Sequence, residues 1–220
     1  MQPPARADLS RTWALVPIRG LETAKTRLGA DLDAEERAAL VTVMLHRTLQ
    51  ATRDAQHIAG TVVVTQDGDA AEIARRHDAV GLVERAPGLN GAIEAARSVA
   101  QARGATAVLV LPADLPAVSG DALDELLHAA RAAIERDAND GEAGVVALVP
   151  DRHGEGTNAL LVSPPELIDS AFGATSHVRH VAAARHAGAR VLELGGPLAL
   201  DVDTTDDLLD AEATLGSLRG

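Results

Sequence analysis

The sequence predicts an α/β fold with a mainly parallel central sheet that helices cover on both faces. Short runs of Val, Leu and Ala, typical of strands buried on both faces, alternate with segments of helical periodicity. With 220 residues, 46% of them hydrophobic, the chain is long enough for a well-filled core. Aromatic residues make up only 1%, so small aliphatic side chains must build that core.

The sequence predicts a flexible segment at residues 1–11 and a folded domain at residues 12–220. The first ten positions contain two prolines and show no periodicity, so we expect residues 1–11 to form a flexible N-terminal tail. No internal repeat or linker interrupts the remainder. We therefore expect residues 12–220 to form one domain.

The first half of the chain predicts four strands and four helices in alternation. Continuous apolar or β-branched runs predict strands at 12–17, 61–65, 80–83 and 107–111. Helical spacing and capping residues predict helices at 33–53, 69–77, 91–103 and 119–137. The first helix opens with a variant of the capping box, Asp33 followed by Glu36, and the fourth is capped by either Ser119 or Asp121.

The second half continues the pattern. It predicts strands at 145–149, 159–162, 191–194 and 198–204, and helices at 164–170, 176–186 and from 205 onward. Ligands of such sheets bind beyond the carboxyl ends of the strands. We therefore expect the loops at 19–27, 88–91, 114 and 151–158 to meet at that edge.

Composition excludes several function classes. The formal net charge of −12 argues against nucleic-acid binding, which needs a basic surface, and the scarcity of aromatic residues argues against base stacking. The absence of cysteine excludes disulfides, thiolate metal sites and a thiol nucleophile. No apolar run approaches the length of a membrane span, so we expect a cytoplasmic protein without a membrane partner. The sequence leaves a homodimer open.

A basic loop follows the first predicted strand. It contains Gly20 and places Arg19, Lys25 and Arg27 within nine positions, an arrangement typical of phosphate binding after a strand. Lys25 is the single lysine of the chain, although Lys and Arg together number 20. A compact ammonium fits between phosphate oxygens where a planar guanidinium does not. The alternative is a solvated surface lysine.

Carboxylates occupy two strand-end positions. Asp114 directly follows the most hydrophobic predicted strand, where it either binds Mg²⁺ or forms an ordinary turn. Asp201 and Asp203 flank Val202, so in an extended segment both carboxylates share one face. Like charges so placed repel unless a cation lies between them. They therefore form a second candidate Mg²⁺ position, the alternative being a solvated face.

Three further loops carry polar groups. Gly88 and Asn90 offer backbone groups and an amide for a base edge, and the segment Gly156–Asn158 offers donors to an anion. The segment Phe172–Ser176 precedes a helix and could hold a carboxylate, or Ser176 could simply be its N-cap. The eight His residues show no metal-ligand spacing, and we interpret them as surface groups.

Together these stretches resemble the guanylyltransferases of coenzyme F420 biosynthesis, which act on 2-phospho-L-lactate or phosphoenolpyruvate. The resemblance runs in order from about Trp13 to Leu208. It depends on the following set: Val16-Pro17-Ile18-Arg19, Ala24-Lys25-Thr26-Arg27-Leu28, Gly88-Leu89-Asn90, Leu111-Pro112-Ala113-Asp114-Leu115-Pro116, Gly156-Thr157-Asn158-Ala159-Leu160, Phe172-Gly173 with Ser176, and Asp201-Val202-Asp203-Thr204.

The resemblance implies a Rossmann-like nucleotidyltransferase fold and a reaction. GTP would be the donor, and the phosphate of a three-carbon phospho-acid would attack its α-phosphorus and release pyrophosphate. The family pattern implies that Asp114, Asp201 and Asp203 hold Mg²⁺, with Asp114 and Lys25 as catalytic residues. It assigns the nucleotide to Arg19, Lys25, Arg27, Gly88 and Asn90, and the acceptor carboxylate to Thr157, Gly173 and Ser176. Position 19 departs from the family, where Lys is more usual than Arg.

Two other functions stay open at this level. A related enzyme with another acceptor, such as a molybdenum-cofactor guanylyltransferase, usually has a Gly-Gly-x-Ser-x-Arg first loop, which the segment 18–21 lacks. A catalytically silent nucleotide-binding module is the second alternative, although all three candidate metal ligands are present. The sequence does not distinguish phosphoenolpyruvate, 2-phospho-L-lactate and 3-phosphoglycerate as acceptors.

Overall fold

The computed structural model describes residues 7–21, 32–84, 88–136 and 142–215. Its strands form one sheet and are β1 (Thr12–Pro17), β2 (Ile58–Thr65), β3 (Val80–Val83), β4 (Ala107–Val110), β5 (Val145–Pro150), β6 (Thr157–Ser163) and β7 (Arg190–Glu193). Its helices are α1 (Ala34–Asp54), α2 (Gly68–Arg76), α3 (Leu89–Ala102), α4 (Gly120–Arg136), α5 (Ser176–His186), the short 3₁₀ helix η2 (Pro197–Ala199) and α6 (Thr205–Leu215).

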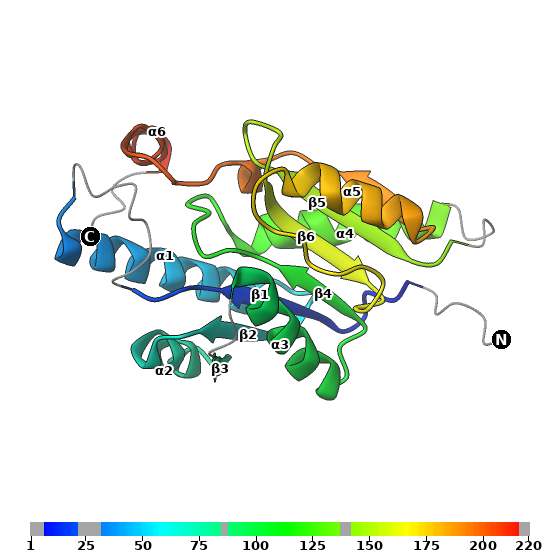
Figure 1. Cartoon of the computed structure of the whole chain (residues 1–220), viewed down its shortest axis with the longest axis horizontal. Helices are drawn as coiled ribbons and strands as arrows, with labels where there is room; N and C mark the ends of the chain where they lie inside the picture. The colour runs from blue at the N-terminus through cyan, green and yellow to red at the C-terminus, as the bar shows by residue number, and fades with distance from the viewer. Residues whose placement is uncertain (1–6, 22–31, 85–87, 137–141, 216–220) are drawn as a thin grey trace.

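The strand order is β3-β2-β1-β4-β6-β5-β7, and β6 alone among these strands is antiparallel to its neighbours. The chain moves outward from β1 through β2 to β3 and then crosses to β4 on the other side of β1. The strand order therefore reverses between β1 and β4, and the region beyond the carboxyl ends of two such strands is the usual ligand position in these sheets. In Figure 1 that edge faces left, toward α6 and the start of α1.

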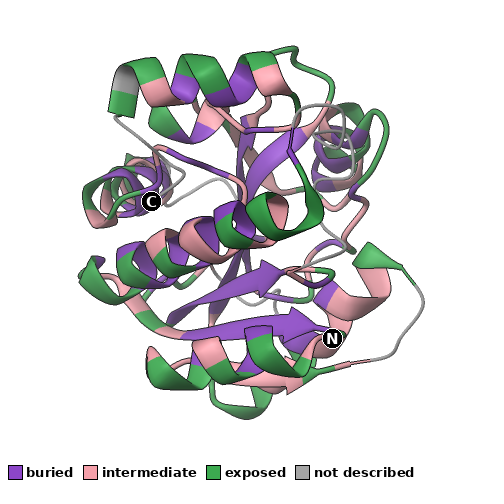
Figure 2. Cartoon of the chain, turned by 90° about the vertical axis from the view of Figure 1, so that its left-hand side faces the viewer, coloured by how far each residue is buried: buried purple, intermediate pink, exposed green. Residues whose placement is uncertain are grey.

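Two apolar layers cover the sheet, because alternate strand residues point to opposite faces. Leu109 and Ala147 pack with α1 and α4 on one face. Val108 and Val146 pack with α3 and α5 on the other face. Figure 2 looks onto the carboxyl edge and shows the buried strands enclosed by helices on both sides. The expected mainly parallel sheet with helices on both faces is confirmed.

Local capping chemistry begins two of the helices. Asp33 accepts hydrogen bonds from the backbone of Glu35 and Glu36, while the Glu36 carboxylate accepts one from the Asp33 backbone, which completes the predicted capping box of α1. Ser119, rather than Asp121, caps α4, since its Oγ accepts a hydrogen bond from the Ala122 backbone. Neighbouring residues alone satisfy these caps, which explains why the sequence could predict the α1 cap and limit the α4 cap to two candidates.

Two predicted elements are wrong. Residues 164–170 form a turn rather than a helix: one backbone bond, from the Leu167 N–H to the Pro164 carbonyl, closes the turn, and other polar groups of the segment bond to α3. Residues 198–204 do not form a strand: η2 is followed by an extended connection that has no ladder with the sheet. Local pattern does not reveal whether an extended segment finds a strand partner.

The described part of the predicted N-terminal tail, residues 7–11, contacts the rest of the protein. Leu9 is buried in the cluster that α1 and α4 share. The Asp8 backbone N–H donates to Ser163 Oγ at 2.9 Å, and Ser163 Oγ donates to the Asp8 carbonyl at 3.0 Å. The tail therefore runs beside the end of β6.

Candidate functional site

The loop after β1 carries the first expected group of residues. Arg19 is exposed, and its carbonyl accepts a hydrogen bond from the Gln66 backbone after β2. Asp67 accepts a hydrogen bond from the Leu21 backbone at 3.0 Å and also caps α2. The Leu21 bond lowers the pKa of Asp67. Lys25 and Arg27 lie outside the described residues.

The candidate metal ligands come from two adjacent segments. The Val202 backbone N–H donates to the Asp114 carbonyl at 3.1 Å, so the connection after η2 runs beside the end of β4. Val202 is fully buried, whereas Asp201 and Asp203 are half-buried on either side of it. The expected alternation therefore holds although the segment is not a strand.

These carboxylates are not assembled into a protein cage. Among the residues that the structure describes, no group of three or more His, Asp, Glu or Cys side chains is arranged to hold a metal ion. Mg²⁺ is often bound through one or two carboxylates and completes its shell with phosphate oxygens and water. The donors present, half-buried carboxylates near the carboxyl end of β4, fit that mode of binding.

Asp207, an acid in the first turn of α6, shapes this segment. One carboxylate oxygen accepts hydrogen bonds from the backbones of Asp203 (2.9 Å) and Thr204 (2.7 Å). The other oxygen pairs with the guanidinium of Arg152, which comes from the loop between β5 and β6. The buried Asp207 carboxylate therefore connects residues 201–204, the candidate metal segment, to the loop that leads to Thr157.

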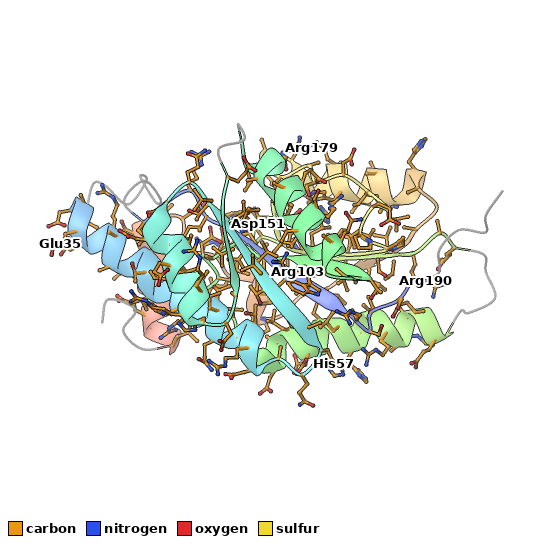
Figure 3. All side chains as sticks on the ribbon, turned by 90° about the horizontal axis from the view of Figure 1, so that it is seen from below. Glu35, His57, Arg103, Asp151, Arg179 and Arg190 are labelled. Carbon is orange, nitrogen blue, oxygen red and sulfur yellow. The ribbon has the colours of Figure 1, made fainter. Side chains whose placement is uncertain are left out.

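The loop of residues 151–156 is held by Asp151 (Figure 3), whose carboxylate accepts hydrogen bonds from the backbones of His153, Glu155 and Gly156. Since β6 is antiparallel to β4, this loop delivers the start of β6 to the carboxyl edge. Asn158 Nδ2 donates to the Leu198 carbonyl at 3.1 Å and lies 3.5 Å from Asp201 Oδ1. Asn158 thus contacts the backbone just before the candidate metal segment and the side chain of its first residue, Asp201.

The predicted acceptor residues Thr157 and Ser176 are brought together. Ser176 Oγ donates to Thr157 Oγ1 at 3.2 Å, and both residues are buried. Gly173, at the surface, has φ of +118°, a backbone conformation that L side chains rarely adopt. Arg179 (Figure 3), which sequence reasoning missed, donates to the Ala174 carbonyl at 2.9 Å and adds a cation to this loop.

The N-terminus of α5 is less available to an anion than the sequence suggested. Thr175, in the left-handed region at φ +55°, occupies the N-cap position in place of Ser176. The Ser176 N–H donates to the Gly173 carbonyl, and the His177 N–H donates to the Glu155 carbonyl. The hydroxyls of Thr157 and Ser176, rather than these two N–H groups, are therefore the donors that could meet an anion here.

His180 corrects the interpretation of all histidines as surface groups. It is fully buried, with Nδ1 3.0 Å from Thr157 Oγ1 and with Nε2 accepting a hydrogen bond from the Ala171 backbone at 2.9 Å. Burial lowers its pKa to about 4, with contributions from Arg179 and His177. The only sequence signal was its i+4 spacing from Ser176.

Asn90 makes contacts that the sequence did not predict. Its side-chain oxygen accepts a hydrogen bond from the Phe172 N–H at 2.8 Å, and its Nδ2 donates to the Phe172 carbonyl at 3.1 Å. Gly88, with φ of +85°, is the N-cap of the same helix. The first turn of α3, assigned to the nucleotide, is therefore joined directly to the loop assigned to the acceptor.

The chain belongs to the guanylyl transferase CofC-like family. The family's sequence model matches residues 12–213, which include every candidate site residue. A protein of Sphaerobacter thermophilus named phosphoenolpyruvate guanylyltransferase is 40% identical over 198 residues, or 90% of each chain. The predicted family resemblance is thereby confirmed.

Solved structures support the same fold. A crystal structure from Desulfovibrio desulfuricans, described as a nucleotide-diphospho-sugar transferase, aligns with a TM-score of 0.71 at 20% identity and covers 93% of this chain and 87% of its own. A Mycobacterium tuberculosis protein in complex with manganese aligns with a TM-score of 0.54 at 22% identity, covering 93% of this chain and all of its own. No helix among the described residues is both long and apolar enough to cross a membrane.

Proposed function

We propose that this protein transfers the guanylyl group of GTP to the phosphate of phosphoenolpyruvate and releases pyrophosphate, as a step of coenzyme F420 biosynthesis. The family match over residues 12–213 carries the proposal. The identity of 40% with a phosphoenolpyruvate guanylyltransferase supports this acceptor over 2-phospho-L-lactate. Both substrates are intracellular metabolites, in keeping with a cytoplasmic location.

The nucleotide side of the site would lie beyond β1 and β3. Arg19, Lys25 and Arg27 would neutralise the triphosphate, and the first turn of α3 at Gly88 and Asn90 would lie near the guanine. Since Asn90 already bonds to Phe172, its amide retains one N–H and one lone pair for a base edge. The Asn90 side chain would therefore contact both the nucleotide and the loop at Phe172–Ser176, which is assigned to the acceptor.

The acceptor side would lie between β6 and α5. Thr157, Ser176 and the Gly173 backbone would bind the carboxylate of the acid, and Arg179 adds positive charge at the rim. An acceptor phosphate oxygen then forms a bond to the α-phosphorus of GTP as the bond to pyrophosphate breaks. The acceptor is already an anion, so positioning and charge neutralisation are sufficient and no base is required.

A divalent cation, Mg²⁺ in this proposal, would be held by Asp114 with Asp201 and Asp203. When bound it would neutralise phosphate charge. The observed hydrogen bond from Val202 to Asp114 supports this assignment, because it joins the two segments that supply the carboxylates. The manganese complex of the fold relative agrees with a divalent ion in proteins of this shape.

The test is a pyrophosphate-release assay with GTP and Mg²⁺ and, separately, phosphoenolpyruvate, 2-phospho-L-lactate and 3-phosphoglycerate. The next enzyme of the pathway is added so that an unstable product is trapped. The highest kcat/KM is expected with phosphoenolpyruvate. GTP binding by calorimetry without turnover of any acceptor would instead support a silent binding module.

Asp114→Asn tests the metal assignment. Loss of one carboxylate ligand is expected to lower kcat about 100-fold or more, the scale of losing one major electrostatic contact in a transition state. Asp121→Asn, an exposed acid in the first turn of α4, is the matched control and is expected to retain wild-type activity. Wild-type activity in Asp114→Asn would remove Asp114 from the reaction.

A further inference from the structure

The environment of His180 fixes which of its ring nitrogens carries the proton. A backbone N–H can only donate, so the bond from Ala171 requires an unprotonated Nε2. The proton of the neutral ring is therefore on Nδ1, which lies 3.0 Å from Thr157 Oγ1. The Phe172 ring packs edge-on against the imidazole, with centroids 4.9 Å apart, and helps to hold its orientation.

This tautomer determines what the Thr157 hydroxyl can do. Because Nδ1–H donates, Thr157 cannot donate its own proton to His180. Ser176 and Thr157 hold two hydroxyl protons between them, and one of these bridges their oxygens at 3.2 Å. The other proton has no acceptor in this buried triad and must be directed elsewhere.

We propose that His180 is a positioning residue that orients the Thr157–Ser176 hydroxyl pair so that one proton is donated to the acceptor's carboxylate. This inference rests on the proposed function, since it assigns the carboxylate to this pair. A donor held in place before binding loses little rotational entropy when the anion arrives. His180 does not touch the acceptor and acts only through Thr157.

Two substitutions separate the two contacts of the ring. In His180→Gln the side-chain oxygen can take the place of Nε2 and accept from Ala171, but the donor to Thr157 is lost. In His180→Asn the side-chain nitrogen can take the place of Nδ1 and donate to Thr157, but the acceptor for Ala171 is lost. His186→Gln, at an exposed position of the same helix, is the control.

The steady-state assay should separate acceptor from donor binding. We expect His180→Gln to raise KM for phosphoenolpyruvate at least 10-fold with less than a twofold change in KM for GTP. His180→Asn should recover most of the acceptor affinity, and His186→Gln should match the wild type. Equal acceptor KM in His180→Gln and wild type, or equal loss for both substrates in both variants, would overturn the proposal.

A second measurement does not depend on turnover. ¹⁵N-edited NMR of the wild-type protein should show His180 as the neutral Nδ1–H tautomer at neutral pH, and an Nε2–H tautomer would overturn the inference. Calorimetry with phosphoenolpyruvate alone should show weaker binding to His180→Gln than to wild type. If the wild type turns over none of the three acceptors, the proposed function fails. The NMR tautomer and the binding of phosphoenolpyruvate by calorimetry then still test whether His180 orients the hydroxyl pair.

Discussion

At the scale of single residues, burial determines the roles of polar groups in this site. His180 and the exposed His186 lie on the same helix, yet only His180 is enclosed and hydrogen-bonded at both nitrogens. A charged imidazole buried here would lack the hydration that it has in water, and protonation of Nε2 would remove the acceptor for the Ala171 N–H. The neutral ring is therefore part of the folded structure.

The stability of the protein should accordingly depend on pH through His180. Its pKa is about 4 in the folded state against 6.5 for an unperturbed histidine, so between these values the unfolded chain binds a proton that the native protein does not. Stability contributed at neutral pH is lost as pH falls through this window. From pH 7 to about pH 4.5 we expect His180 to cost the native state about 2 kcal/mol of stability.

Urea denaturation at both pH values measures this loss. Carboxylates also contribute to the acid sensitivity of a protein with 32 Asp and Glu residues, so the comparison with His180→Gln isolates the histidine. The wild type should lose about 2 kcal/mol more than His180→Gln over the same interval. Parallel losses in the two proteins would show that His180 is protonated equally in the folded and unfolded states.

At the scale of elements, the segment 164–170 does not form the predicted helix but packs along one face of α3. Four α3 residues spaced by four, three and four positions contact this segment, and each makes its bond within the stretch 166–172. They are Asn90, Glu94, Arg97 and Gln101. Such spacing places side chains on one helix face. Side chains of α3 thus satisfy most of the polar contacts of the segment, which has one backbone bond of its own, from Leu167 to Pro164.

Arg97 is the central residue of this contact. Its guanidinium donates to the Ile168 carbonyl at 2.9 Å and to Ser170 Oγ at 3.1 Å, and it lies 3.2 Å from Glu94. The side chain is only 5% exposed. Burial lowers its pKa, while the neighbouring carboxylate of Glu94 opposes that shift.

Arg97→Met is expected to lower the free energy of unfolding by about 2–4 kcal/mol, since buried acceptors lose a charged donor. Denaturant unfolding measures this change. Arg103→Met, at the exposed C-cap of the same helix (Figure 3), should change it by no more than about 0.5 kcal/mol. Equal effects of the two substitutions would mean that Arg97 contributes only as surface charge.

At the scale of the whole molecule, the C-terminal segment completes the carboxyl edge. Val202, Leu208 and Ala211 pack against Leu40 and Met44 of α1. The pair of Arg152 and Asp207 joins this segment to the loop before β6. Residues about fifty positions apart therefore hold the segment 201–204 beside the loop of residues 151–156.

A double-mutant cycle of Arg152→Met and Asp207→Asn should show a coupling energy of about 1–3 kcal/mol in unfolding experiments, because the Asp207 side chain is buried and accepts charge-assisted bonds. The exposed pair of Arg53 and Asp78, 3.5 Å apart, is the control cycle, with coupling of about 0.5 kcal/mol or less. Coupling as small as the control would show that the two segments dock independently.

The sequence predicted the positions of those candidate site residues that strand ends and short motifs define. Asp114 follows β4, and Thr157 and Ser176 meet, as the family pattern implied. Sequence reasoning missed His180, Arg152 and the role of Asp207, because the Thr157–His180 and Arg152–Asp207 contacts join residues 23 or more positions apart. It also could not foresee that β6 is reversed, since an apolar run does not indicate strand direction.

By itself, the sequence determined the order of most elements, the cap of α1, and the family. These follow from local periodicity, from hydrogen bonds between near neighbours and from motifs. Only the tertiary structure decided that His180 is buried and neutral and that α3 binds the segment 164–172. It also decided that the residues around Val202 lie beside the end of β4, through a backbone bond to Asp114. The physical reason is that burial and long-range hydrogen bonds depend on which segments meet, and a local pattern does not contain that information.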